Sequence, residues 1–344
     1  MGESQGRFVT GLVRIAPHRG DHRVAIRAAV SIAVPLLILW AIGRVDLSVY
    51  ASFGAFASLY GRYDRYADRI RMQIAAGATM LVCMLIGTGL SILGTPTMLR
   101  VVVVGLVAGV VALIAHAWHW HPPSSLFAVF SAGACASLPA TATSFLEVVI
   151  VGGASALFSV ALTAGIAFAR RGRRVLAPGR ATQPADRRAV GAAVTVGVGA
   201  LLAGIAGLLL IGDHWYWAMV GAVAALGGAH LTARLIRGVQ RLVGTLIGVA
   251  VAAGLLALGL PPLATIAVAI VCQAGAELYV NRNYGLAMVF ITPLALLMVE
   301  LAFPTDPATL LADRTLDTLV GVAVGTAVAV VSAYLRRLRA EPTA

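Results

Sequence analysis

The sequence predicts an all-α, polytopic membrane protein with about twelve transmembrane helices in two tandem six-helix repeats. Hydrophobic residues make up 60% of the 344 residues and charged residues only 12%, whereas a soluble domain averages about half apolar and a quarter charged residues. Apolar runs near the roughly 20 residues needed to cross a bilayer recur along the chain. The alternating segments of about 10 residues that are typical of a transmembrane β-barrel are not evident.

A repeated stretch predicts the duplication. Tyr50–Gly89 and Trp215–Gly254 each contain a short run of small and aromatic residues, an arginine-rich turn and a long apolar helix. At a shift of 167 positions identical residues coincide, namely Gly54 with Gly221, Ala55 with Ala222, Gly61 with Gly228, Gln73 with Gln240 and Gly77 with Gly244. Because six crossings bring each half back to the same side, we expect the two repeats to be related by an axis along the membrane normal.

Six crossings are expected in each half. The first six lie at 26–43, 47–61, 72–94, 98–117, 123–138 and 145–168, and the second six at 189–211, 214–231, 238–259, 262–279, 284–302 and 314–335. The expected organisation is a cytosolic N-terminal arm (1–23), a first membrane repeat (24–169), a basic cytosolic linker (170–188), a second membrane repeat (189–335) and a cytosolic tail (336–344). The linker is rich in Arg and Pro and too short for a folded domain.

The distribution of arginine predicts the orientation. All 26 basic residues are Arg, and with the N-terminus in the cytosol only Arg44, Arg100 and Arg314 fall on the outer side. This bias follows the positive-inside rule and accounts for the net charge of +12 without a nucleic-acid partner. The first 23 residues contain no compact apolar segment with a cleavage site, so we expect a retained arm. The absence of Lys suits a high-GC bacterial genome, and we expect the bacterial inner (plasma) membrane, with both termini cytosolic.

The two short, glycine-rich helices at 47–61 and 214–231 allow two interpretations. Small residues let helices pack closely, and a short helix at a repeat interface can also present its end to an anionic substrate. Aromatic residues flank both helices, and they fit either an interfacial belt or a π-surface for an aromatic ligand. These residues are Tyr50, Phe53, Tyr60, Trp215, Tyr216 and Trp217.

Arg241 and Arg314 stand at matching positions of two related patterns. Arg241-x-x-Gly244-Thr245-x-x-Gly248 is echoed by Arg314-x-x-Asp317-Thr318-x-x-Gly321, which is either a chance similarity or a trace of inverted three-helix units. Each arginine can extend its charged end to water or lipid phosphate, or form two parallel hydrogen bonds to a carboxylate. In the second case Thr245 and Thr318, one turn deeper, supply hydroxyl donors.

Asp317 and Gln240 are the remaining polar candidates. Asp317 fits an i,i+3 pair with Arg314 at a helix N-terminus, or a carboxylate that carries a coupled proton. Gln240, with Gln73 and Gln273, fits either helix–helix hydrogen bonds or a polar path. The three isolated cysteines and the loosely spaced histidines at 116–121 predict no metal site. No catalytic motif is evident, so we expect neither an enzyme nor a cofactor.

The aromatic–glycine helix, the arginine turn, the RLVGTLIG helix and the late ADRTLDTLVGVAVG helix together resemble the fusaric acid resistance protein-like (FUSC) family. This family is related to bacterial aromatic acid exporters and, more distantly, to plant malate-type anion channels. The resemblance is best over 189–335 and recurs more weakly over 24–168. It implies a plasma-membrane protein that moves aromatic or other organic carboxylates outward. Longer members carry a large cytosolic domain, where this chain has only the linker at 170–188.

The resulting hypothesis is a transporter that exports small organic, aromatic carboxylates by alternating access, with proton coupling through Asp317. Its substrate site comprises Tyr50, Tyr216, Trp217, Gln240, Arg241, Thr245, Arg314 and Thr318. The expected surroundings are the lipid bilayer, and a homo-oligomer is allowed. The alternatives are a passive organic-anion channel and a non-transporting accessory subunit of the membrane.

Overall fold

A computed structural model describes residues 10–18, 20–122, 124–171, 182–228 and 230–340. Within these ranges every regular element is helical and no strand occurs, as the all-α prediction requires. Parts of the expected arm (1–9 and 19), of the linker (172–181) and of the tail (341–344) lie outside the described residues, as does residue 123 at the start of the expected fifth crossing.

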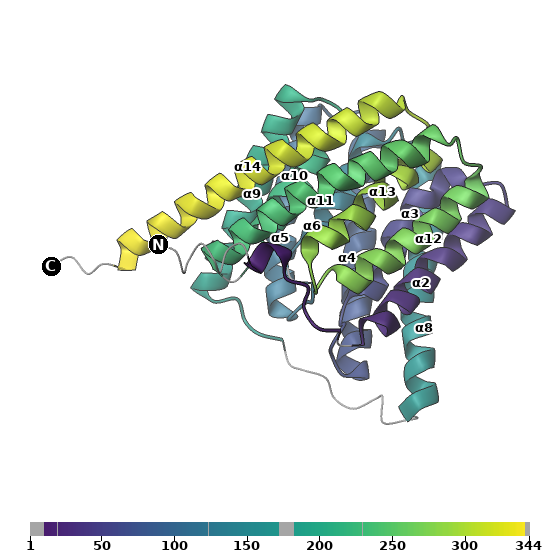
Figure 1. Ribbon diagram of the computed structural model, residues 1–344, viewed down its shortest axis with the longest axis horizontal. Helices are drawn as coiled ribbons and strands as arrows, with labels where there is room; N and C mark the ends of the chain where they lie inside the picture. Colours follow the sequence, from purple (N-terminus) through teal and green to yellow (C-terminus); the bar gives the residue numbers. More distant parts are fainter. Residues whose placement is uncertain (1–9, 19, 123, 172–181, 229, 341–344) are drawn as a thin grey trace.

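The helices fall into two successive sets. The first contains α2 (Asp21–Ala41), η1 (Val45–Leu47), α3 (Ser48–Ala55), η2 (Phe56–Leu59), α4 (Tyr66–Ile92), α5 (Thr97–Ala117), α6 (Leu126–Ser137), α7 (Ala142–Glu147), the π-helical turn η3 (Val148–Gly152) and α8 (Gly153–Arg171). The second contains α9 (Arg187–Leu210), α10 (Tyr216–Leu226), α11 (Leu231–Ala257), α12 (Pro262–Tyr279), α13 (Tyr284–Ala302) and α14 (Pro307–Ala340). Figure 1 shows them as one bundle.

Local sequence explains where several of these helices begin. The side chain of Asp186 accepts a hydrogen bond from the amide of Ala189 (2.7 Å) at the start of α9, and Asn283 does the same for Leu286 (3.0 Å) at the start of α13. Both residues satisfy an amide that would otherwise lack a partner at a helix N-terminus. Pro262 is the first residue of α12, where its missing N–H costs nothing.

Nine helices in the described part of the chain are long and apolar enough to cross a membrane. The other three expected crossings, 47–61, 123–138 and 214–231, coincide with the shorter apolar segments Val45–Leu59, Leu126–Ser137 and Tyr216–Leu226. The eleven residues of α10 extend only about 16 Å at 1.5 Å per residue, about half of the hydrocarbon thickness. The protein is therefore a multi-pass membrane protein, but full-length helices account for nine of the twelve expected crossings.

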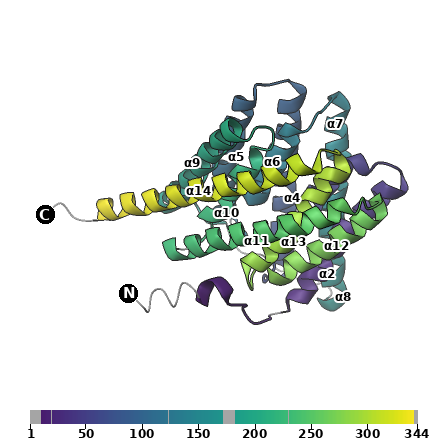
Figure 2. The same ribbon diagram turned by 45° about the horizontal axis from the view of Figure 1, so that its top comes forward.

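The two sets of helices pack in parallel ways. In the first set α3 packs against α2, α4 and α8, and in the second α10 packs against α9, α11 and α14. Helices of the two halves also pack against each other: α5 of the first half packs on α9 of the second, and α12 of the second packs on α2 of the first. In Figures 1 and 2 the long helices α11 and α14 run side by side across the second half. The two sets thus share a packing pattern around a short helix, while the duplication stays a prediction.

The short helices lie inside the bundle and have no lipid-facing surface. All eight residues of α3 and all eleven of α10 are buried. A Cβ at Gly54 would lie 2.2 Å from the carbonyl oxygen of Gly152, and one at Gly221 would lie 3.1 Å from the Cα of Gly321. The small residues therefore provide the close packing of short helices against the last helix of each half.

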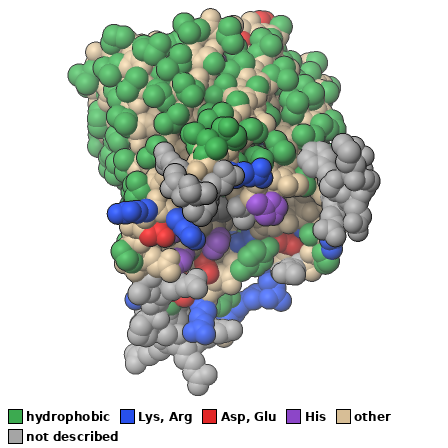
Figure 3. Space-filling view, turned by 90° about the vertical axis from the view of Figure 1, so that its left-hand side faces the viewer, with side chains coloured by type: hydrophobic (Ala, Val, Ile, Leu, Met, Phe, Trp, Pro, Cys, Tyr) green, Lys and Arg blue, Asp and Glu red, His purple; other side chains and the backbone are tan. Residues whose placement is uncertain are grey.

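The outer surface of the bundle is apolar. Large side chains such as Leu157, Leu209 and Val271 are exposed on spanning helices. Figure 3 shows one face on which hydrophobic side chains cover the upper part, while Arg, His and acidic side chains gather in the lower part. A broad apolar surface with a charged end is the surface expected of a protein embedded in lipid.

Candidate functional site

A cavity of about 370 Å³ lies between the two halves. Residues of α3, η2 and α6 line it from the first half, and residues of α10, α11, α12, α13 and α14 line it from the second. Its volume falls in the range of about 300–1,000 Å³ that is usual for small-molecule sites. All three short helices line this cavity: α3 through Val49 and Phe53, α6 through Phe127 and Phe130, and α10 along its length from Tyr216 to Ala224.

One wall of the cavity is cationic. Arg241 of α11 donates a hydrogen bond from Nη1 to the hydroxyl of Tyr284 (2.8 Å), and the guanidinium of Arg237 lies 3.8 Å from the centre of the Tyr284 ring. From α14, the guanidinium of Arg314 lies 5.1 Å from the ring centre of Trp217. Arg241 and Arg314 are each only 2% exposed, so neither reaches out to water or lipid phosphate.

These three arginines form no direct ion pair with a carboxylate of the described residues, although Arg314 is attracted electrostatically to Asp317 behind the cavity wall. Within the described residues none of them forms a salt bridge, and the Nε atoms of Arg237, Arg241 and Arg314 are buried without a hydrogen-bond partner. The single glutamate in the lining, Glu277, is paired with a fourth arginine, Arg62. Because a buried charge without a partner is costly, the excess of positive charge prepares the cavity for an anion.

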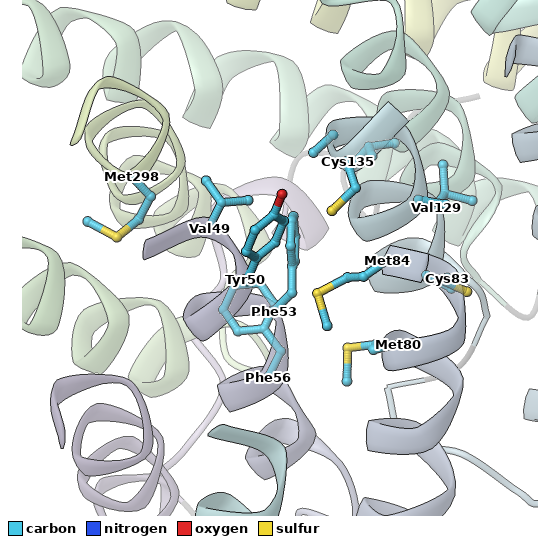
Figure 4. Close-up of a cluster of buried hydrophobic side chains, with 14 of the residues drawn as sticks. Val49, Tyr50, Phe53, Phe56, Met80, Cys83, Met84, Val129, Cys135 and Met298 are labelled. Atoms are coloured by element: carbon cyan, nitrogen blue, oxygen red, sulfur yellow. The ribbon is translucent and has the colours of Figure 1, made fainter. Parts of the chain in front are cut away.

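Another part of the cavity wall is aromatic. The rings of Phe53 and Phe130 meet edge to face with their centres 5.0 Å apart, Phe56 and Phe127 are 5.1 Å apart, and Phe130 stacks on Tyr216 at 6.1 Å. All five residues line the cavity. Figure 4 shows the α3 side of this wall, where Phe53 and Phe56 project beside Tyr50 and face the methionines of α4. Such a wall suits the face or edge of an aromatic ring.

Three of the residues predicted for the substrate site, Tyr216, Arg241 and Arg314, line the cavity together. Tyr50 and Trp217 do not. Tyr50 is buried in the hydrophobic core beside Val49 and Phe53 (Figure 4). Trp217 is fully buried behind the cavity, where it stacks on His214 with ring centres 4.6 Å apart.

The other predicted residues, Gln240, Thr245 and Thr318, do not line the cavity. Thr318 donates its hydroxyl hydrogen bond to the backbone carbonyl of Arg314 (2.9 Å), one turn earlier in α14. Thr245 is fully buried and its hydroxyl has no partner among the described residues. Gln240 donates from Nε2 to the carbonyl oxygens of Gly11 (3.3 Å) and Leu12 (3.1 Å), so it holds the N-terminal arm.

Asp317 is completely buried and does not line the cavity. It forms no salt bridge with Arg314 among the described residues, and neither carboxylate oxygen makes a hydrogen bond of normal geometry there. It is nevertheless attracted electrostatically to Arg314 and lies near the backbone amide of Ala218. The carboxylate lies against α9 and α10, because a Cβ at Gly207 would be 3.1 Å from its Oδ1. Arg314 and Asp317 therefore interact electrostatically without a direct salt bridge, and a buried acid of this kind inside a membrane protein is a candidate for proton binding.

The aromatic residues that flank the short helices do not form a belt at the membrane interface. Phe53, Trp215 and Trp217, like the other three, are almost completely buried in the protein. A belt residue would expose its ring to lipid headgroups. Burial inside the bundle explains the difference, because α3 and α10 are covered by other helices on all sides.

The sequence interpretation missed part of the site. Tyr284, which no sequence pattern marks as a site residue, stands at the start of its helix and accepts the hydrogen bond from Arg241. Arg237 could have been found, because it lies four residues before Arg241 on the same helix face. Glu277 is buried and bonded to Arg62, which lies 215 residues away in sequence. No spacing rule predicts a contact at that separation.

Hydrogen bonds gather the expected cytosolic segments at one end of the bundle. Arg62 contacts Asp21 (3.4 Å) and Glu277, and Asn281 donates to the hydroxyl of Tyr63 (3.2 Å). Arg282 donates from Nε to the carbonyl of Ala16 (2.9 Å), which joins the arm to the loop after α12. The segments that the arginine distribution assigns to one side thus meet at one mouth of the cavity, which is lined by Tyr63, a residue that is 61% exposed.

The sequence model of the family described as Fusaric acid resistance protein-like matches residues 198–328, from within α9 to within α14. The resemblance inferred from the sequence is thereby confirmed over this segment, which contains Arg237, Arg241 and Arg314. Searches of curated proteins and of solved structures gave no match.

Proposed function

We propose that the chain is a transporter that exports organic, aromatic carboxylates across the bacterial inner membrane through the cavity between its halves. One observation carries the proposal: Arg237, Arg241 and Arg314 line a cavity with an aromatic wall and form no salt bridge with any described residue. The match to the fusaric acid resistance protein-like family over residues 198–328 and the nine membrane-spanning helices support a transport function.

The two walls of the cavity recognise the two ends of such a substrate. A carboxylate accepts two parallel hydrogen bonds from the planar guanidinium of Arg241, whose position Tyr284 fixes. The ring of the substrate then packs against Phe127 and Phe130, where face and edge contacts are favourable. The arrangement favours a compact acid with one negative charge over an uncharged aromatic or a small inorganic anion.

Transport requires the two halves to move against each other around the cavity. The reciprocal packing of α5 on α9 and of α12 on α2 supports a duplicated six-helix unit, as in transporters whose repeats rock about a central site. Asp317 is our candidate for the coupled proton because it is a completely buried acid one turn from Arg314 and forms no salt bridge among the described residues. Both termini are assigned to the cytosol from the distribution of arginine.

The proposal is tested by counterflow in proteoliposomes. Vesicles loaded with unlabelled 4-aminohippurate, an aromatic carboxylate that leaks slowly, are diluted into the labelled compound, and uptake is compared with that of protein-free vesicles. Substitution Arg241→Gln removes a charge-assisted interaction and is expected to weaken binding about 10- to 150-fold and to reduce counterflow accordingly. Arg234→Gln, on the same helix but outside the cavity, is the matched control and should retain counterflow.

The outcomes separate the candidate functions. Normal counterflow by a correctly inserted Arg241→Gln protein would remove this arginine from the site. Unitary currents of 4-aminohippurate in planar bilayers would identify a channel instead. Wild-type vesicles that behave like protein-free vesicles in both assays would favour an accessory subunit.

A further inference from the structure

The mouth of the cavity holds a buried ion pair whose acid competes chemically with the proposed substrate. Arg62, which follows η2 in the first half, donates from Nη2 to Oε2 of Glu277 in α12 of the second half. Its Nη1 donates to the backbone carbonyl of Glu277 (2.9 Å). Both residues line the cavity, and their side chains are only 6% and 8% exposed. The glutamate thus presents to Arg62 the same carboxylate group that a substrate would present.

Asp21 is a second acid on Arg62, but it occupies a different place. Its Oδ1 lies 3.4 Å from Nη1 of Arg62, and its Oδ2 lies 3.3 Å from the imidazole of His18 in the N-terminal arm. Asp21 does not line the cavity. A ligand in the cavity therefore meets Arg62 on the side that Glu277 occupies and leaves the contact with Asp21 in place.

Displaced from Arg62, Glu277 has another cation within reach. Arg27 of α2 interacts electrostatically with Glu277. The Arg27 residue is 6% exposed, and its Nη2 donates a hydrogen bond to the carbonyl of Ser58 (3.1 Å). Its Nε has no hydrogen-bond partner among the described residues. A buried carboxylate that loses its partner is costly. A move toward Arg27 limits that cost, so exchange of one carboxylate for another on Arg62 is physically feasible.

The ion pair also joins the two halves. Among the salt bridges of the described residues, only the one between Arg62 and Glu277 connects the first set of helices to the second. A neighbouring hydrogen bond from Asn281 to Tyr63 follows the same path across the boundary. Any ligand that takes the place of Glu277 on Arg62 removes the charged link between the halves at this end.

We propose that Glu277 is an internal counter-ion of Arg62 that an incoming organic carboxylate replaces, so that substrate binding itself releases the two halves at the cytosolic mouth. Arg62 is then the first cation to receive the substrate, ahead of the more deeply buried Arg241. The step is an exchange of ionic partners in which no covalent bond changes. This inference rests on the proposed function, because it requires that the cavity binds a carboxylate.

The test is a double-mutant cycle on benzoate binding, measured by isothermal titration calorimetry on the full chain in detergent. Glu277→Gln keeps the shape of the side chain and a neutral hydrogen bond to Arg62, but it no longer competes as a carboxylate. Since a charge-assisted hydrogen bond is about twice as strong as a neutral one, benzoate should bind about 5- to 10-fold more tightly to this variant. A residue that only supported the fold would give weaker binding when substituted.

The second arm of the cycle separates replacement from a general electrostatic effect. In the Arg62→Gln background, Glu277→Gln should give no further gain, because the contested cation is absent. Asp21→Asn removes an acid from the same arginine outside the cavity and should change affinity much less than Glu277→Gln. Size-exclusion chromatography checks that each variant is folded. If Arg62→Gln is not folded, Arg62→Lys takes its place, because lysine keeps the charge but lacks the planar guanidinium. In the Arg62→Lys background the increase in benzoate affinity caused by Glu277→Gln should be smaller than in the wild type.

Benzoate binding that is unchanged or weaker in Glu277→Gln would overturn the inference. An equal increase in benzoate affinity when Glu277→Gln is made in the Arg62→Gln background would overturn it as well, and so would an equal increase in Asp21→Asn. These results differ from a failure of the proposed function, which would appear as an absence of benzoate binding to the wild-type protein.

Discussion

The contact between α10 and α14 gives a stability prediction with a defined magnitude. A Cβ at Gly321 would lie 2.3 Å from the carbonyl oxygen of Ala218 and 3.0 Å from the Cα of Gly221. These neighbours are backbone atoms that cannot rotate away. Ordinary contact distances begin near 3.4 Å, so the two helices would have to separate by about 1 Å to admit one methyl group.

We expect Gly321→Ala to lower the free energy of unfolding by about 1–3 kcal/mol, the usual cost of an additional methyl group in a packed interior. Gly254→Ala is the matched control, because it lies in the helix α11 and a Cβ there meets nothing within 4 Å. Alanine has the higher helix propensity, by up to about 1 kcal/mol, so the control should be slightly more stable than the wild type. The two substitutions are chemically identical and are expected to act in opposite directions.

Unfolding by dodecylsulfate, followed by tryptophan fluorescence in mild detergent, measures both variants. Trp215 and Trp217 are buried at the start of α10, so their emission reports on the helix that the substitution displaces. Equal stabilities of Gly321→Ala and Gly254→Ala would refute the reasoning, since they would mean that α10 and α14 are not in backbone contact.

Three further predictions concern the aromatic wall, the coupled proton and a helix terminus. Phe130→Leu removes the ring that stacks on Tyr216 and should weaken benzoate binding about 2- to 12-fold by calorimetry, with little effect on cyclohexanecarboxylate. Asp317→Asn should abolish accumulation of 4-aminohippurate driven by a pH gradient in proteoliposomes but retain counterflow. Hydrogen bonds from the amide and hydroxyl of Thr309 lower the pKa of Asp306 below its ordinary 3.8. This carboxylate therefore contributes stability at neutral pH, and the contribution is lost as the pH falls through the lowered pKa. Asp306→Ala should reduce the melting temperature at pH 7, and the difference from the wild type should shrink below about pH 4.

Each of these predictions has a contrary outcome. Equal losses of benzoate and cyclohexanecarboxylate binding in Phe130→Leu would show that volume matters and the π-surface does not. Loss of counterflow in Asp317→Asn would indicate a role in folding or binding and exclude a role confined to the proton. A melting difference for Asp306→Ala that is the same at low and neutral pH would contradict its role as an ionised helix cap.

The sequence predicted the fold class because hydropathy reports directly on the environment of each helix. It could not count crossings, because hydropathy does not distinguish α10, which is apolar because other helices surround it, from a helix that is apolar because lipid surrounds it. The glycines of the repeated stretch were informative for a physical reason. Gly54 and Gly221 both lie against the backbone of the last helix in their half, where a side chain would be crowded.

The site was predictable only where a local pattern marked it. Arg241 and Arg314 were found because an arginine inside an apolar helix is unusual, and both face the cavity. Arg62 and Glu277 were missed as a pair, since their contact depends on how α12 packs against the first half. The order of the residues along the chain does not contain that information.

The most direct test of the account is the location of a bound aromatic carboxylate. In a structure determined with 3-iodobenzoate, the anomalous signal of iodine marks the ring independently of the map of the protein. We predict iodine in the cavity between the halves, beside Phe127 and Phe130, with the carboxylate directed at Arg241. Iodine found only outside the cavity, or a carboxylate directed away from Arg237, Arg241 and Arg314, would contradict the proposal that this cavity carries the substrate.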